Sequence, residues 1–215
     1  MALPRINPMQ LILLPEPFDH PEWIFELKHD GFRCVAYVPD GKCRLVSRRG
    51  NVYSSIKNLQ LELASLRVKD AIIDGEIVCL DSDGHSLFYE LLRRKGRPVL
   101  YGFDLLYLNG EDLRQQPLIE RKRKLHGLIK AAKKKCPNLL YARHVDARGN
   151  DLFRLVCASN SEGVVAKRRI GLYGISERWF KIRNRQYSQM EGRRELFDSF
   201  KLHKRPVAIA VSRRA

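Results

Sequence analysis

One lysine stands in a segment whose neighbours would suit a nucleophile. Lys28 is followed by Asp30 and Arg33 in the run ELKHDGFR at 26–33. A lysine is a nucleophile only after its ammonium loses a proton, and a nearby cation such as Arg33 favours that loss. Lys28 is therefore a candidate nucleophile. The alternative is a surface lysine on a hairpin, because so short a motif recurs by chance.

Two later segments place unusual side chains within apolar, strand-forming residues. Glu76 follows Ile72 and Ile73, and a carboxylate in such a strand is costly unless it meets a donor. Glu76 could accept hydrogen bonds from a ribose, or it could face water from an edge strand. Phe103, in the run YGFDLL, could stack on a purine or belong to the core.

Two further segments combine acidic and basic side chains with strand patterns. Glu162 and Lys167 begin and end the run EGVVAK, so they would lie at opposite ends of a pocket. Glu162 could bind Mg²⁺ and Lys167 could contact a phosphate. Alternation puts Lys181 and Arg183 on one face, where they would clamp an α-phosphate. The alternatives are a solvated strand end and a half-exposed strand.

The elements that must position these residues alternate between strands and helices. Residues 1–22 are rich in proline and predict an extended lead-in that packs on the body. Apolar periodicity predicts the rest. The expected strands are 23–28, 33–38, 43–47, 70–80, 99–108, 138–143, 162–168, 178–182 and a strand-like run at 207–211, and the expected helices are 56–66, 87–94, 117–135, 147–158 and 195–200.

The charge of the chain predicts a polyanionic partner. Its 215 residues carry a net charge of +16, spread along the sequence, which suits tracking a nucleic-acid backbone. The alternative is a solubilising surface. The five cysteines show no paired spacing, which argues against a zinc site or disulfides and for a reducing compartment. No apolar run approaches the roughly 18 residues of a membrane span. We expect a cytoplasmic protein, associated with the nucleoid if bacterial.

The order of these segments resembles the covalent nucleotidyltransferase superfamily, and within it the adenylation domain of ATP-dependent DNA ligases. The matching segments span about residues 20 to 185 and are ELKHDGFR, SRRG, DGE, YGFDLL, EGVVAK and WFKIR. The run 103–124 is more similar to bacterial ligases of the end-joining type than to RNA ligases or capping enzymes. The resemblance implies an α+β, ATP-grasp-like core, with two mainly antiparallel sheets packed with helices around an ATP cleft.

The resemblance implies ATP and Mg²⁺ (or Mn²⁺) as cofactors, with Lys28 taking AMP onto its amine. Glu26 would read the adenine amino group, Glu76 would hold the ribose, and Phe103 would stack on the base. The remaining residues would serve the phosphates and the metal. They are Arg33, Arg48, Lys167, Lys181 and Arg183 for the nucleotide or the 5′-phosphate of the nick, and Asp30 and Glu162 for the metal. Arg183 stands where the family usually has lysine, which changes its donor geometry.

The expected division is an adenylation domain at 1–185 and a basic extension at 186–215, too short for the OB-fold domain that such ligases carry. The implied function is transfer of AMP from Lys28 to the 5′-phosphate of nicked double-stranded DNA, followed by sealing. A repair-complex protein, or an OB-fold supplied in trans, is a possible further partner. The alternatives are a non-sealing module that binds ATP or DNA ends, and an RNA ligase.

Overall fold

The computed structural model describes residues 3–174 and 176–190 and contains two sheets. The larger has the strand order β4-β3-β5-β6-β7, with β8 beside β6, and the smaller has the order β1-β11-β10-β2-β9. The β6–β8 and β1–β11 pairs are parallel and the others antiparallel. The strands are β1 Leu11–Leu14, β2 Asp19–Leu27, β3 Phe32–Pro39, β4 Arg44–Ser47, β5 Asp70–Cys79, β6 Pro98–Leu108, β7 Glu111–Asp112, β8 Leu139–Tyr141, β9 His144–Arg148, β10 Gly163–Arg168 and β11 Trp179–Arg183.

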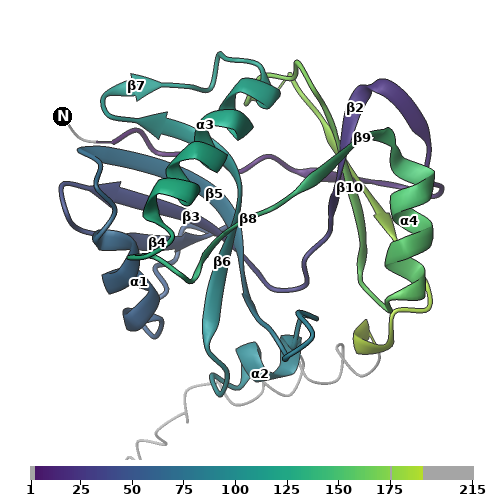
Figure 1. Ribbon diagram of the computed structural model, residues 1–215, viewed down its shortest axis with the longest axis horizontal. Coiled ribbons are helices and arrows are strands. Elements are labelled where there is room, and N and C mark those ends of the chain that lie inside the picture. The colour runs from purple at the N-terminus through teal and green to yellow at the C-terminus, as the bar shows by residue number, and fades with distance from the viewer. Residues whose placement is uncertain (1–2, 175, 191–215) are drawn as a thin grey trace, which may run out of the picture.

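The helices cover the outer faces of the two sheets (Figure 1). Apolar side chains of α1 (Lys57–Ala64), α2 (Phe88–Leu92) and α3 (Leu118–Ala132) pack in one core with the larger sheet. Helix α4 (Gly149–Ala158) packs on the smaller sheet, and a short 3₁₀ turn follows at Ser188–Met190. None of the helices in the described part is long and apolar enough to cross a membrane.

A third apolar cluster lies between the sheets and holds them face to face. The larger sheet contributes Val35, Ile72 and Phe103, and the smaller contributes Val165 and Trp179. Because these residues come from opposite sheets, the space beside them forms a cleft whose walls are both rigid. This architecture confirms the predicted α+β class with two mainly antiparallel sheets.

The predicted elements are largely confirmed, with three corrections. Residues 1–22 are more than a lead-in, since they include β1 and the start of β2. The helix predicted from 147 begins at 149, after a strand, β9, whose charged sequence HVDAR gave no apolar signal. The segment around Lys28 joins strands of different sheets, so the hairpin alternative is wrong. The elements predicted at 195–200 and 207–211 lie outside the described residues.

Candidate active site

Lys28 lies where the chain passes from the smaller sheet to the larger one. Its peptide N–H donates to the carbonyl oxygen of Gly163 at 2.8 Å, which fixes the crossing to β10. Gly163 has φ +154°, and a Cβ there would lie 2.1 Å from the carbonyl oxygen of Ile182. A Cβ on Gly31 would lie 2.1 Å from that of Ile77. Both glycines are required because backbone from another strand passes at contact distance.

The Lys28 side chain is paired with Glu162. Its Nζ donates to Oε2 at 2.7 Å, and the two side chains are 17% and 6% exposed. Nucleophilic attack by Lys28 would therefore require this pair to separate. Lys28 is thus close to solvent and held by Glu162.

Further cations share this end of the cleft. Burial lowers the pKa of half-buried Lys181, and the positive charges of Arg183, Lys28 and Arg48 lower it further. These four side chains come from three separate segments, so their proximity is produced by the fold. Among the described residues Arg48, Lys181 and Arg183 form no ion pair. Their charges can therefore meet an anionic ligand.

Three carboxyl groups approach Lys28 as well. Burial raises the pKa of Glu76 to about 8, against the attraction of Lys28 and Arg33, and the negative charges of Glu162 and Asp30 add to the rise. Asp30 is buried and accepts a hydrogen bond from the Tyr187 hydroxyl at 2.9 Å. Carboxylate oxygens are the ligands that Mg²⁺ prefers. Within the described residues, however, the three ligand atoms that lie within 4.8 Å of one another belong to Asp81, Asp83 and His85, so the metal roles of Asp30 and Glu162 stay predictions.

The opposite end of the cleft is occupied by a buried cluster around Glu26. Lys122 Nζ lies 2.5 Å from Glu26 Oε1, and Lys167 Nζ lies 2.6 Å from Oε2. Burial alone would raise the pKa of Glu26, but the two ammonium groups outweigh it and hold the pKa below its usual value. Burial also lowers the pKa of Lys167 to about 8, despite the attraction of Glu26. Glu162 immediately precedes β10 and Lys167 lies near the other end of that strand, and their position at opposite ends of a ligand pocket stays a prediction.

Phe103 forms the floor between these two ends. Lys167 Nζ and Arg33 Cζ lie 4.3 and 4.6 Å from its ring centroid, and Trp179 meets it edge-to-face at 5.8 Å. The cavity beside it measures about 40 Å³, room for about one water. A nucleotide can therefore enter only if side chains around this ring move. The residues lining the cavity include Glu26, Lys28, Arg33, Glu76, Phe103, Lys167 and Trp179.

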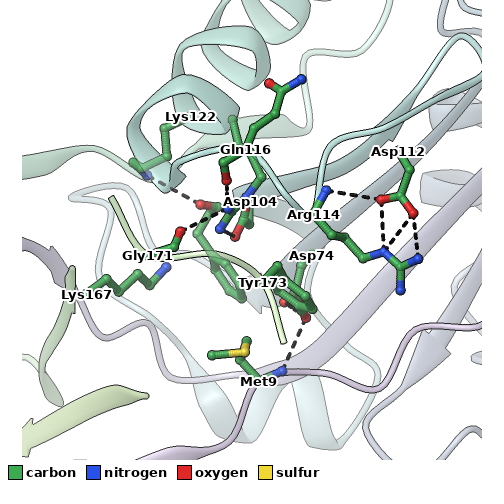
Figure 2. Close-up of polar contacts among 12 residues, drawn as sticks. Met9, Asp74, Asp104, Asp112, Arg114, Gln116, Lys122, Lys167, Gly171 and Tyr173 are labelled. Carbon is green, nitrogen blue, oxygen red and sulfur yellow. Dashed lines mark hydrogen bonds and ion pairs between the residues drawn. The ribbon is translucent and has the colours of Figure 1, made fainter. Parts of the chain in front are cut away.

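A network of buried ion pairs supports the floor from below. Arg33 makes two hydrogen bonds to Asp74, of 2.7 and 2.6 Å, and the Tyr173 hydroxyl donates to Asp74 Oδ2 at 2.6 Å. The same hydroxyl accepts the peptide N–H of Met9 at 3.2 Å (Figure 2). Arg33 thus lines the cavity but is already bound to Asp74, so its contact with a nucleotide stays a prediction.

A second buried arginine ties α3 to the larger sheet and to the loop that follows β10. Arg121 donates twice to Asp104, each time at 2.8 Å, and also to the carbonyl oxygens of Gln116 and Gly171. Leu118 N–H, in the first turn of α3, donates to the same Gly171 carbonyl. The described part of the chain contains no buried side-chain nitrogen or oxygen without a hydrogen-bond partner. The network is thus fully satisfied, which is the condition for a stable buried polar cluster.

The predicted site residues converge on this cleft with two qualifications. Arg48 lines a neighbouring groove of about 450 Å³, together with Arg5, Arg44 and Arg49. Lys167 contacts Glu26 and the aromatic rings of the floor, so its unliganded contacts do not support a phosphate role. The ligand contacts of every site residue stay predictions.

Several residues of the cleft were not predicted from the sequence, namely Asp74, Asp104, Arg121, Lys122, Tyr173 and Trp179. A signal for Arg121 and Lys122 was present. Both lie on the helical stripe formed by Leu118, Leu125 and Ile129, all of which are buried. These two residues were overlooked because they belong to a run of charged residues at 120–124, and such a run usually indicates a solvent-exposed helix face.

Comparisons with known proteins agree with this geometry. Residues 13–183 match the model of the ATP dependent DNA ligase domain. The multifunctional non-homologous end joining protein LigD of Pseudomonas aeruginosa is 33% identical over 182 residues, which are 81% of this chain and 21% of that protein. The SPbeta prophage-derived DNA ligase-like protein LigB of Bacillus subtilis is 29% identical over 195 residues, 86% of this chain and 70% of that protein.

Solved structures show the same relationship. A mycobacterial DNA ligase D complexed with ATP and MES superposes with a TM-score of 0.70 at 29% identity, covering 83% of this chain and 60% of that one. The ATP-dependent DNA ligase of bacteriophage T7 in complex with ATP shares the fold, with a TM-score of 0.59 at 14% identity and coverage of 83% and 69%. The chain thus spans about a fifth of the LigD protein and most of the smaller relatives. With its lysine at the crossing of two sheets and a match over 13–183, the chain belongs to the ATP-dependent DNA ligase domain family.

Proposed function

We propose that this domain transfers AMP from ATP to Lys28 and then to the 5′-phosphate of nicked double-stranded DNA, so that the nick can be sealed. The observation that carries the proposal is the position of Lys28. It lines the same cavity as the Phe103 ring, and it is close enough to Lys181, Arg183 and Arg48 for their charges to interact, while these three cations form no ion pair among the described residues. A nucleophile, a base platform and a phosphate clamp are the parts that nucleotidyl transfer needs.

In the first step the Lys28 amine would attack the α-phosphorus of ATP. The new bond is P–N, the bond to pyrophosphate breaks, and the amine gives up its proton. The 5′-phosphate of the nick would next attack the same phosphorus and break the P–N bond, which returns Lys28. Attack by the 3′-hydroxyl on the activated 5′-phosphate would release AMP and seal the strand.

The residues around Lys28 would divide this work. Lys181, Arg183 and Arg48 would neutralise charge on the phosphates, since stabilisation of developing charge is the main task in phosphoryl transfer. Asp30 and Glu162 would hold Mg²⁺, which would shield the triphosphate when bound. Glu76, whose pKa is near 8, could both donate to and accept from a ribose hydroxyl at neutral pH.

The proposal is tested by incubation with ATP labelled at the α-phosphate and Mg²⁺, followed by denaturing electrophoresis. We expect label on the wild type and none on Lys28→Ala, with an unchanged far-ultraviolet spectrum and melting temperature. Lys42→Ala, which removes an exposed lysine from a turn, is the matched control and should label normally. Label that persists in Lys28→Ala would refute Lys28 as the nucleophile.

The labelled protein then separates sealing from the alternatives. Mixed with nicked DNA or nicked RNA, it should lose label to the DNA 5′-phosphate and join the strand. Preference for the RNA nick would favour an RNA ligase. Label that is transferred to neither nick would favour a non-sealing module. Adding an OB-fold protein or a repair-complex partner would then test whether a second protein enables sealing. Binding to DNA should weaken steeply with salt, because neutralised phosphates release counterions.

A further inference from the structure

Lys122 is a buried cation that the proposed chemistry does not use. It lies in the second turn of α3, and its fully buried side chain contacts other residues of the protein. Its Nζ donates to Glu26 Oε1 at 2.5 Å, to the Ala142 carbonyl at 3.0 Å and to the Phe103 carbonyl at 3.4 Å. An ammonium has three N–H donors, and all three of Lys122 are engaged. Because the acceptors belong to three separate segments, they fix the position of the Lys122 ammonium.

The position of Lys122 determines what Glu26 can offer a ligand. Each Glu26 oxygen receives one ammonium, from Lys122 or Lys167, and each keeps a second lone pair. Two cations against one carboxylate hold it ionised, and an ionised carboxylate can only accept hydrogen bonds. Glu26 lines the cavity beside Phe103, so it faces the place where a base would stack.

This chemistry discriminates between purines. Position 6 of adenine carries an amino group that donates, whereas guanine carries a carbonyl that accepts. An acceptor-only carboxylate therefore matches adenine and repels the lone pairs of a 6-oxo purine. A protonated or neutral group at Glu26 would lose this distinction, since it could donate as well.

Lys167 also binds the Glu26 carboxylate, but it cannot be used to test this idea because it lines the cavity and could contact the ligand directly. It lines the cavity and its Nζ lies 4.0 Å from the ring centroid of Trp179, so its removal would change the pocket itself. Lys122 lies behind Glu26 and is not among the residues lining the cavity. An effect of Lys122 on a nucleotide must therefore pass through a residue that it contacts and that lines the cavity, which is Glu26 or Phe103, and a double variant with Glu26 separates the two.

We propose that Lys122 is a positioning residue for base selection, which holds Glu26 as an acceptor-only group for the amino group of adenine. The inference rests on the proposed use of ATP, but it concerns binding and not transfer. It makes the nucleotide preference of the domain depend on a residue of α3 that never touches the nucleotide.

The test measures equilibrium binding of ATP, of purine riboside triphosphate, which lacks the amino group, and of ITP, which carries a 6-carbonyl. Wild type should prefer ATP over both by about tenfold or more, because hydrogen bonds to charged groups are among the stronger ones. Lys122→Met should lower this preference at least about threefold. Lys124→Met, which removes a surface lysine from the same helix, should leave it unchanged.

A double variant shows whether Lys122 acts through Glu26. Glu26→Gln alone should lower the preference, and adding Lys122→Met should lower it no further. If Lys122→Met does not fold, Lys122→Gln replaces it, since an amide still donates to the carbonyls but carries no charge. An unchanged preference in a folded Lys122 variant, or an additive loss in the double variant, would overturn the proposal.

Labelling of Lys28 in parallel keeps the two proposals apart. Selective ATP binding without label would defeat the transfer and leave base selection intact. Label with unaltered selectivity in Lys122→Met would defeat base selection alone. A wild type that binds ATP no better than purine riboside triphosphate would overturn the role of Lys122 whatever the label shows.

Discussion

The two ends of the cleft are built in opposite ways. At the base end, Glu26 is clamped by Lys122 and Lys167, with the ion pairs of Arg33 and Arg121 around it, all buried and all matched within the protein. At the phosphate end, cations gather near Lys28 and, within the described ranges, three of them lack an acidic partner. The protein neutralises its own charges where a neutral base would bind and leaves charge available where phosphates would bind.

Because the two ends are built differently, variants there should affect different properties, stability at one end and activity at the other. A buried ion pair contributes little net stability over apolar packing, but loss of one partner leaves an uncompensated charge in the interior. A cation near solvent has little effect on the free energy of unfolding, whether it is present or removed. Variants at the base end should therefore lose stability, and variants at the phosphate end should lose activity alone.

The largest effect is expected from Arg121→Met. It leaves the Asp104 carboxylate, which is fully buried, without its partner, so we expect a loss of about 3–5 kcal/mol in the free energy of unfolding. Urea unfolding followed by circular dichroism measures it. The control is Arg114→Met, which breaks a surface pair with Asp112 and should cost about 0–1 kcal/mol. Equal losses in both variants would contradict the comparison.

An intermediate effect is expected from Lys181→Ala. It removes one cation of the phosphate end, and we expect a fall of about 100-fold in the rate of Lys28 labelling, typical of losing one donor to developing charge. The free energy of unfolding should change by less than about 0.5 kcal/mol, as for a surface substitution. A large loss of stability at unchanged labelling would place Lys181 in the structural network instead.

The smallest effect concerns Glu76 and pH. Its pKa in the folded protein is about 8, above the ordinary 4.5, so the stability it contributes is complete below pH 4.5 and is lost as pH rises through 8. Glu76→Gln removes this titration. The variant should gain stability relative to wild type as pH rises from 5 to 9, because a neutral amide never becomes a buried charge. Parallel stability curves would show that Glu76 titrates normally.

Much of the fold follows from local sequence, because most strands are short apolar runs with clear boundaries. What local sequence does not contain is the sheet to which each strand belongs. The strands on either side of Lys28 look like a hairpin, yet they pair with β10 and β5, respectively, which lie far along the chain. Strand β9 was missed because its charged side chains suit an edge and carry no apolar alternation.

Site residues could be predicted from the sequence where a chemical role requires a particular kind of side chain, as at Lys28, Glu76 and Phe103. The supporting ion pairs could not, because partners such as Arg121 and Asp104 are recognised only when helix and strand are in contact. Lys122 shows the difficulty most clearly. In the sequence it is one of several charges on a helix, and only the fold turns it inward to Glu26.

The parallel pairing of β1 with β11 has a practical consequence for any shortened form of the domain. Leu11–Leu14 cover the edge of the strand that carries Trp179 and Lys181. A fragment trimmed to the family match at residue 13 would cut β1 in half and leave part of β11 as an unprotected edge, open to pairing with other chains. Such a cut would move the edge of the smaller sheet from β1 to the strand that carries Lys181, so expression designs should begin before residue 11.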